Sequence, residues 1–196
     1  MQTTHPGRVI TAAVLPRSTA INVALVTGFA LFTALMAQIS IPLGFTPVPI
    51  TGQTFAVLLS GAALGSRLGP MSQGLYWGMG AIGLPFYAKG AGGWEVATGA
   101  TAGYLIGFVV AAWVVGRLAE AHQDRQAGTA MLAFVVGTVI IHLLGVPWLA
   151  NVLDVSWSRA AVLGSYPFIV GDLVKIGLAA VVLPASWKLA SGLRKG

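Results

Sequence analysis

Long uncharged stretches, separated by short polar segments, dominate the sequence. Four of these stretches contain no Asp, Glu, Lys or Arg: residues 18–66, 68–88, 96–116 and 126–153. A helix needs about 20 mostly apolar residues to cross a bilayer, so the first stretch is long enough for two such helices. Pro42, Pro47 and Pro49 interrupt this stretch and exclude one continuous helix across it.

The pattern therefore predicts an all-α integral membrane protein with six transmembrane helices in one compact bundle. The expected helices lie near residues 19–41, 52–68, 68–88, 96–116, 126–153 and 160–187. Two connections are polar: a glycine-rich turn at 89–95 and a solvated loop at 120–126. We expect one transmembrane domain over residues 1–196, with the membrane-embedded bundle at 18–190 and a cytoplasmic N-terminal tail at 1–17.

Composition supports this class. The chain is 56% hydrophobic and only 8% charged, whereas soluble domains carry about 25% charged residues. The net charge of +6 comes from basic residues scattered singly between apolar runs, so we expect membrane lipid and no nucleic acid as a partner. Because cysteine is absent, a disulfide and a thiolate metal site are both excluded.

The basic residues are unequally divided between the two sets of connections. Eight of them fall on the side of the predicted bundle that holds the termini: Arg8, Arg17, Arg67, Arg117, Arg125, Lys188, Arg194 and Lys195. The opposite side holds only Lys89 and Arg159, and Lys175 lies within a helix. Since Lys and Arg accumulate in cytoplasmic connections, we expect both termini in the cytoplasm. The expected location is the bacterial cytoplasmic membrane, which the chain would cross several times.

The last predicted span contains an acid and a base, Asp172 and Lys175, far from any other charge. A charged side chain inside a bilayer costs at least about 2.5–3.5 kcal/mol. Three residues apart, the two side chains share one helix face. A structural ion pair is one interpretation. The other is a binding site, because an ionised Asp only accepts and a Lys only donates, which suits a small ligand with N–H groups beside a carbonyl.

Four further residues are candidates for the same kind of site. Gln53 and Thr51 lie in "TPVPITGQTF", just after the prolines, where a stiff loop suits the wall of a pocket; a plain helix start is equally consistent. Tyr104 can present a hydroxyl or a ring face to a pocket, although a tyrosine at such a position is as often buried in packing.

Lys89 is the fourth candidate. It precedes a run of glycines, and the N–H groups of Gly90, Gly92 and Gly93 could hold a carboxylate together with its ammonium. The more common outcome for such a lysine is full solvation in a flexible turn.

Catalytic and metal chemistry have little support in the sequence. His142 lies inside a predicted helix without an acid near it in sequence, and we interpret it as a packed, hydrogen-bonded histidine. The motifs GxxxxGK[ST], GxSxG and HExxH do not occur. We therefore expect no enzyme activity, no cofactor, no metal site and no ATP binding by this chain. Small residues recur every four positions from Gly61 to Gly69 and from Gly99 to Ala111, which predicts close packing inside the bundle.

Four segments, "AQISIPLGFTPVPITGQTF", "GAIGLPFYAKGAGG", "TAGYLIGF" and "YPFIVGDLVK", resemble in sequence and order the BioY family, the biotin-specific S components of energy-coupling factor (ECF) transporters. The resemblance covers about residues 30–180. It implies six helices with biotin held near the outer face, and a complex with a transmembrane T component and two ATP-binding subunits. Ala30 and Ala34 would then contact the T component.

The resemblance also implies a role for each candidate. Asp172 would accept from an N–H of the ureido ring of biotin and Lys175 would donate to its carbonyl. Tyr104 would pack on the thiophane ring, Lys89 would hold the valerate carboxylate, and Gln53 and Thr51 would complete the biotin-binding site. High-affinity biotin capture and uptake is the expected function. Two alternatives stay open: a secondary transporter in which Asp172 relays protons, and a membrane assembly protein in which the pair only locks a helix.

Overall fold

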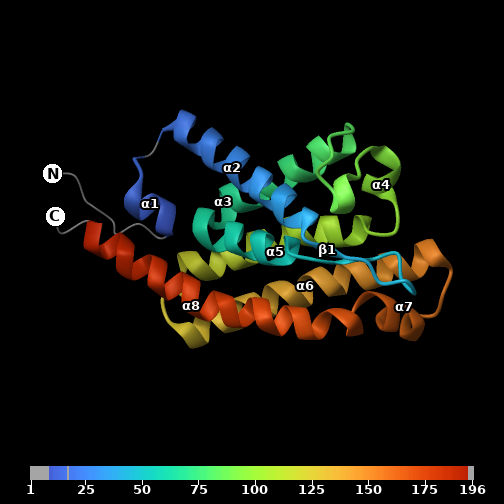
Figure 1. Cartoon of the computed structure of the whole chain (residues 1–196). Helices are drawn as coiled ribbons and strands as arrows, with labels where there is room; N and C mark the ends of the chain where they lie inside the picture. Colours follow the sequence, from blue (N-terminus) through green and yellow to red (C-terminus); the bar gives the residue numbers. More distant parts are fainter. Residues whose placement is uncertain (1–8, 17, 194–196) are drawn as a thin grey trace.

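The computed structural model describes residues 9–16 and 18–193, and almost all of its regular structure is helical (Figure 1). The long elements and the short ones that connect them are α1 (Ile10–Val14), α2 (Thr19–Gln38), β1 (Ser40–Ile41), β2 (Ile50–Thr51), α3 (Gln53–Ala81), η1 (Ala88–Gly90), α4 (Trp94–Thr98), α5 (Ala102–Glu120), α6 (Ala127–Leu153), α7 (Trp157–Gly164), η2 (Tyr166–Phe168) and α8 (Ile169–Leu193).

Helix α2 confirms the first predicted span, with an earlier end. It begins where the Ser18 hydroxyl accepts a hydrogen bond from the Ile21 N–H at 3.2 Å, a standard N-cap. It ends at Gln38 because the next residues enter β1, which pairs antiparallel with β2 in the register Ser40 to Thr51. The proline-rich segment between the strands is therefore a closed loop, as the prolines require.

Helix α3 is a helical hairpin, which accounts for the second and third predicted spans. Gln53 Nε2 donates to the Tyr76 hydroxyl at 2.5 Å, and Gln73 Nε2 donates to Ser60 Oγ at 2.9 Å. These contacts join residues of the two halves in antiparallel order. The chain reverses at Gly65, whose φ of 83° and ψ of −178° are not helical. The predicted boundary near residue 68 was therefore wrong by about one helical turn.

A distant carboxylate fixes this reversal. Glu120 Oε1 accepts from both the backbone N–H and the hydroxyl of Ser66, each at 2.8 Å. The carboxylate thus satisfies donors at the start of the second half of α3, where a negative charge is favoured. Only glycine adopts the positive φ of Gly65 without cost. The turn therefore depends on Gly65 for its backbone conformation and on Glu120 for its hydrogen bonds.

The last predicted span, 160–187, consists of two helices. A break at Ser165 and the short helix η2, which contains Pro167, separate α7 from α8. Asp172 is consequently in the first turn of α8, and Lys175 is one turn further on. The span predicted at 96–116 likewise begins later, at Ala102, after the separate helix α4.

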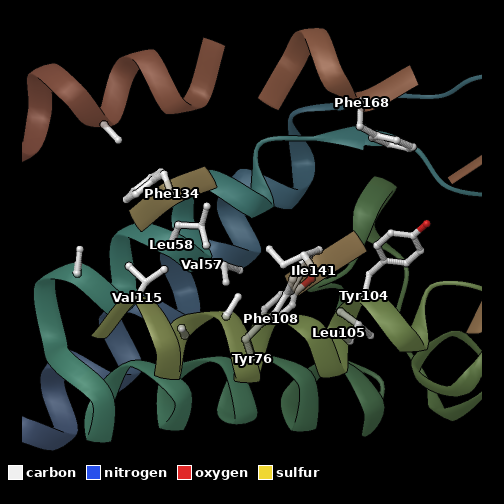
Figure 2. Close-up of a cluster of buried hydrophobic side chains, with 14 of the residues drawn as sticks. Val57, Leu58, Tyr76, Tyr104, Leu105, Phe108, Val115, Phe134, Ile141 and Phe168 are labelled. Carbon is white, nitrogen blue, oxygen red and sulfur yellow. The ribbon is translucent and has the colours of Figure 1, made fainter. Parts of the chain in front are cut away.

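Close backbone contacts between glycines and neighbouring helices hold the bundle together. A side chain at Gly61 would meet the backbone of Ala112, and one at Gly107 would meet that of Ile141 at 3.0 Å. The prediction of small-residue packing within the bundle is thus confirmed at these positions. Side chains such as Phe134 and Phe108 fill the core between the helices (Figure 2).

The protein is a membrane protein by the character of its helices. Within the described residues, four segments are long and apolar enough to cross a bilayer by length and composition: α2, α5, α6 and the segment Trp157–Ser191, which contains α7 and α8. Large apolar side chains on these helices face outward; Leu35, Leu143 and Val170 are 64%, 65% and 73% exposed. Such a surface is stable in contact with lipid.

The two ends of the bundle differ. Helix α1 and the C-terminal part of α8 lie at one end, while α4, α7 and the strands lie at the other (Figure 1). Helix α1 falls within the predicted N-terminal tail and packs on α3, with Thr11 Oγ1 donating to the Ala63 carbonyl at 2.8 Å. Residues 1–8 and 17 of that tail are outside the described residues.

The loop predicted to be solvated at 120–126 is not solvated throughout. Asp124 is only 1% exposed, because its Oδ2 accepts from the Trp187 indole N–H at 2.6 Å beneath α8. Arg125 stacks on the same indole, 4.3 Å from the ring centre. Burial raises the pKa of the Asp124 carboxyl, more than the Trp187 hydrogen bond lowers it.

Candidate functional site

A cavity of about 480 Å³ lies between the proline-rich loop, η1, the α4–α5 connection and the helices α3, α5, α6 and α8. This is the end of the bundle that carries the strands (Figure 1). All six residues predicted from the sequence as ligand contacts line the cavity: Thr51, Gln53, Lys89, Tyr104, Asp172 and Lys175. The chain thus brings together side chains that are up to 124 positions apart in sequence, from 51 to 175.

The centre of the cavity wall is the acid–base pair of α8. Lys175 Nζ lies 3.3 Å from Asp172 Oδ1, and the two side chains are 14% and 8% exposed. Each has a second partner from another helix: Lys175 donates to Thr54 Oγ1 at 2.6 Å, and Asp172 Oδ2 lies 3.0 Å from His142 Nε2. The pair is therefore fixed in position by α3 and α6.

Both members of the pair keep unused hydrogen-bonding capacity. A carboxylate can accept about four hydrogen bonds, and Asp172 has two neighbours, Lys175 and His142. An ammonium has three N–H donors, and Lys175 uses two of them, on Asp172 and Thr54. Since both side chains line the cavity, an acceptor and a donor are available side by side for a ligand.

Gln53 and Thr51 form a second polar part of the wall, at the start of α3. The Thr51 hydroxyl donates to Gln53 Oε1 at 2.8 Å and accepts from the Gln53 backbone N–H at 3.3 Å. The Gln53 amide also donates to the buried Tyr76 hydroxyl, which leaves one of its two N–H donors unassigned. Both predicted roles, helix start and cavity wall, apply to this segment.

Aromatic side chains supply the apolar part of the wall. Tyr104 is 7% exposed and its hydroxyl donates to the Gly164 carbonyl at 2.7 Å. Its ring occupies a notch that exists because Gly145 and Gly164 have no side chains. Phe108 and Phe168 also line the cavity. The Tyr104 hydroxyl is therefore engaged inside the protein, while the ring borders the cavity.

Lys89 lies at the exposed rim of the cavity, in a left-handed backbone conformation with φ of 61°. The expectation that the glycines beside it offer N–H groups is wrong for two of them. The Gly90 N–H donates to Gln38 Oε1 at 2.9 Å, and the Gly93 N–H donates to the Gly80 carbonyl at 2.8 Å. The exposed Lys89 ammonium lies at the rim, where it can meet an anion.

The end of α2 supports both sides of the rim. Gln38 Nε2 donates to the Tyr87 carbonyl at 3.2 Å, in the segment that precedes Lys89. The Gly52 N–H lies between the carbonyls of Met36 and Ile39, at 3.2 and 3.1 Å. The last turn of α2 thus contacts both the turn around Lys89 and the start of α3.

Sequence reasoning missed two residues of the site, Thr54 and His142. His142 is packed and hydrogen-bonded, as expected, but it also lines the cavity and contacts Asp172, which is 30 positions away in sequence. A contact between two helices gives no local signal. Thr54 directly follows Gln53, and its position on the same helix turn was the available signal.

Ala30 and Ala34, predicted to contact a partner subunit, lie elsewhere. They are 1% and 7% exposed, on the buried face of α2, which packs mainly on α3. Their methyl groups are covered by this chain itself, and contact with another protein there would require α2 to separate from α3. That role stays a prediction.

The lining of the cavity combines hydrogen-bonding and apolar groups. Within residues 9–16 and 18–193, no group of three or more His, Cys, Asp or Glu side chains is placed to hold a metal ion. A compact ligand with a polar ring, which both donates and accepts, fits the Asp172–Lys175 pair, and an apolar body fits the aromatic wall.

Comparison with known proteins gives concordant results. The model of the BioY family matches residues 9–192. The biotin transporter BioY of Thermotoga maritima is 41% identical over 155 residues, covering 78% of this chain and 89% of that protein. The probable biotin transporter BioY of Pyrococcus horikoshii is 37% identical over 161 residues, covering 82% and 93%.

One solved structure is also similar. It is the crystal structure of the S-component for biotin from an ECF-type ABC transporter, with a TM-score of 0.78 and 23% sequence identity over 88% of this chain and 95% of that chain. At this identity the similarity establishes the shared fold.

Proposed function

The chain belongs to the BioY family, and from this membership and the cavity we propose that it captures biotin and delivers it across the membrane. One observation carries the proposal: the Asp172–Lys175 pair lines an apolar cavity with an acceptor and a donor unused. The fused ring of biotin offers the complement, two N–H donors and one carbonyl.

In the proposed pose, Asp172 accepts from one ureido N–H and Lys175 donates to the ureido carbonyl. Both are charge-assisted hydrogen bonds in a site with little exposure to water, where such bonds are strongest. Gln53 lines the same cavity, and its unassigned N–H is a further donor for the ring in this pose. Thr51 also lines the cavity and holds the Gln53 amide through its hydroxyl.

The rest of the ligand follows from the shape of the cavity. The thiophane ring packs against the apolar wall of Tyr104 and Phe108, which excludes water from the ureido contacts. The cavity volume of about 480 Å³ lies in the range of about 300–1,000 Å³ typical of small-molecule sites. The valerate chain leads to the rim, where Lys89 pairs with its carboxylate.

Energy for release and uptake comes from partners in this proposal. The sequence has no GxxxxGK[ST] motif, so ATP would be hydrolysed by two separate ATP-binding subunits and coupled through a transmembrane T component. We propose that α2 contributes to the T-component contact, with Ala30 and Ala34 becoming available if α2 separates from α3. The distribution of Lys and Arg supports a cytoplasmic membrane location with both termini in the cytoplasm.

A thermal-shift assay of the detergent-solubilised protein against a panel of vitamins tests the ligand. We expect biotin to raise the melting temperature, since a ligand present at about 100 times its Kd stabilises by about 2.7 kcal/mol. Thiamine, riboflavin and pantothenate are the controls and should leave it unchanged. No shift with biotin, or an equal shift with each vitamin, would reject the proposed ligand.

A further inference from the structure

A histidine of α6, His142, contacts the acid of the binding pair. His142 contacts two groups with its two ring nitrogens: Nδ1 lies 3.2 Å from the Gly164 carbonyl oxygen and Nε2 lies 3.0 Å from Asp172 Oδ2. We infer that His142 is a positioning residue that holds the Asp172 carboxylate through a proton shared between them, so that biotin capture requires this proton. The inference rests on the proposed function.

The requirement for a proton follows from counting donors. A carbonyl oxygen and an ionised carboxylate only accept hydrogen bonds. A neutral imidazole has one N–H donor, so it can satisfy either Gly164 or Asp172, and its other lone pair then faces an acceptor. Both contacts are hydrogen bonds when both ring nitrogens carry protons, which also leaves Asp172 ionised to accept from the ligand.

Within the part of the chain that the structure describes, no other side chain makes a hydrogen bond with the His142 ring. The groups that face His142 from the elements packed on it are Tyr104 of α5, Phe168 of η2, and Asp172 of α8, with Lys175 beyond it. The Tyr104 hydroxyl donates to the Gly164 carbonyl, not to the histidine. Lys175 donates to the opposite oxygen, Oδ1.

The location of His142 and Asp172 indicates what their hydrogen bond does. His142 and Asp172 line the ligand cavity and also a second, largely apolar cavity of about 520 Å³ between α6, α7 and α8. A carboxylate at such a boundary could turn toward either cavity. The hydrogen bond from His142 holds Oδ2, and Lys175 holds Oδ1, so that the remaining lone pairs keep one direction.

The predicted consequence is a pH dependence with a definite sign. Loss of the shared proton leaves the His142 ring with one N–H, so its lone pair faces either Asp172 or the Gly164 carbonyl and the ring no longer holds both. Affinity for biotin should therefore be lower at a pH that removes the shared proton than at a pH that keeps it. A drop of about tenfold corresponds to the loss of one charge-assisted hydrogen bond.

Isothermal titration of biotin into the purified full chain at several pH values tests this inference. His142→Gln keeps an amide that donates to Asp172 at every pH, so it should bind biotin with an affinity that no longer varies with pH. His142→Phe keeps the packing but donates nothing, and should bind about tenfold more weakly than the parent at low pH. His122→Asn, an exposed histidine in the α5–α6 loop with φ of 66°, is the control and should keep the parent profile.

Each outcome decides something. If the parent binds biotin and His142→Gln shows the same pH slope, or His142→Phe binds as tightly as the parent, the inference is wrong while the proposed function stands. If the parent binds no biotin at any pH, the proposed function fails and the inference with it. Unaltered melting temperatures of the variants show that they are folded.

Discussion

Helix α8 carries one buried acid, Asp172, in its first turn and contacts another, Asp124, near its other end, and the two acids are held very differently. Asp172 lies at the cavity and has two nitrogen partners, one on each carboxylate oxygen. Asp124 lies under the other end, where Trp187 donates to one oxygen, while the second oxygen has no hydrogen-bond partner within the described residues. One carboxylate is supported and faces a cavity, and the other is enclosed by packing.

The comparison shows that burial of an acid does not by itself indicate a ligand site. Both carboxylates are removed from water, at 6% and 1% exposure for Asp172 and Asp124. The difference is that Asp172 lines a cavity large enough for a ligand and can accept further hydrogen bonds there. The contacts of Asp124 provide no such position. Substitutions at the two ends of α8 should therefore differ in their effect on ligand binding.

The largest difference is expected from replacing each acid by its amide. Asp172→Asn removes the charge on which Lys175 and the ureido N–H depend, so biotin affinity should fall by at least about a hundredfold, the loss of about two charge-assisted contacts. Asp124→Asn, the matched change at the other end, should leave affinity within about twofold. Isothermal titration measures both; equal losses would show that the two ends do not differ in function.

The second prediction concerns the base. Lys175→Met keeps most of the side-chain length and removes the donors to Asp172 and to the ureido carbonyl, so affinity should fall about tenfold or more. Lys188→Met changes an exposed lysine near the other end of α8 and is the control. An unchanged affinity in Lys175→Met would remove Lys175 from the binding site.

A smaller effect is expected at the rim. Lys89 is exposed, and an exposed ion pair contributes about 0–1 kcal/mol, so Lys89→Ala should weaken biotin binding by no more than about fivefold. The uncharged amide of biotin should bind equally to both proteins. If Lys89→Ala weakens binding of the amide as much as binding of biotin, Lys89 does not pair with the carboxylate.

The smallest effect is on stability, at the end away from the cavity. Because burial raises the pKa of Asp124, the folded protein favours its neutral form, and stability should fall as the pH rises above the ordinary value of 3.8. Asp124→Asn removes this dependence and should raise the melting temperature at neutral pH by about 2–4 °C, equivalent to about 1 kcal/mol. A lower melting temperature in Asp124→Asn would mean that the charged contact with Trp187 outweighs the cost of burial.

Parts of the fold were predictable because the signal is local. The uncharged runs identified α6 to within one residue at each end and α2 to within three, since a bilayer excludes charge from about 20 consecutive positions. The same reasoning singled out Asp172 and Lys175, because two charges inside such a run need a reason to be there. These residues do line the cavity, together with the other four candidates.

What the sequence did not reveal depends on contacts between distant segments. The reversal of α3 at Gly65 is stabilised by Glu120, from the end of α5, which accepts hydrogen bonds from Ser66. The sequence around residue 65 does not indicate this partner. The burial of Asp124 likewise depends on Trp187, 63 positions away. A polar run looks solvated until the helix that covers it is known.

The hydrogen bonds of Gln38 tie the mouth of the cavity to one helix terminus. Its amide joins the Tyr87 and Gly90 segment to α2, and the neighbouring carbonyls of Met36 and Ile39 hold Gly52, where α3 begins. Both sides of the entrance are therefore hydrogen-bonded to the last turn of α2. A tilt of α2 would strain the hydrogen bonds on both sides together. A movement of this helix could therefore change the shape of the entrance without any contact with the ligand.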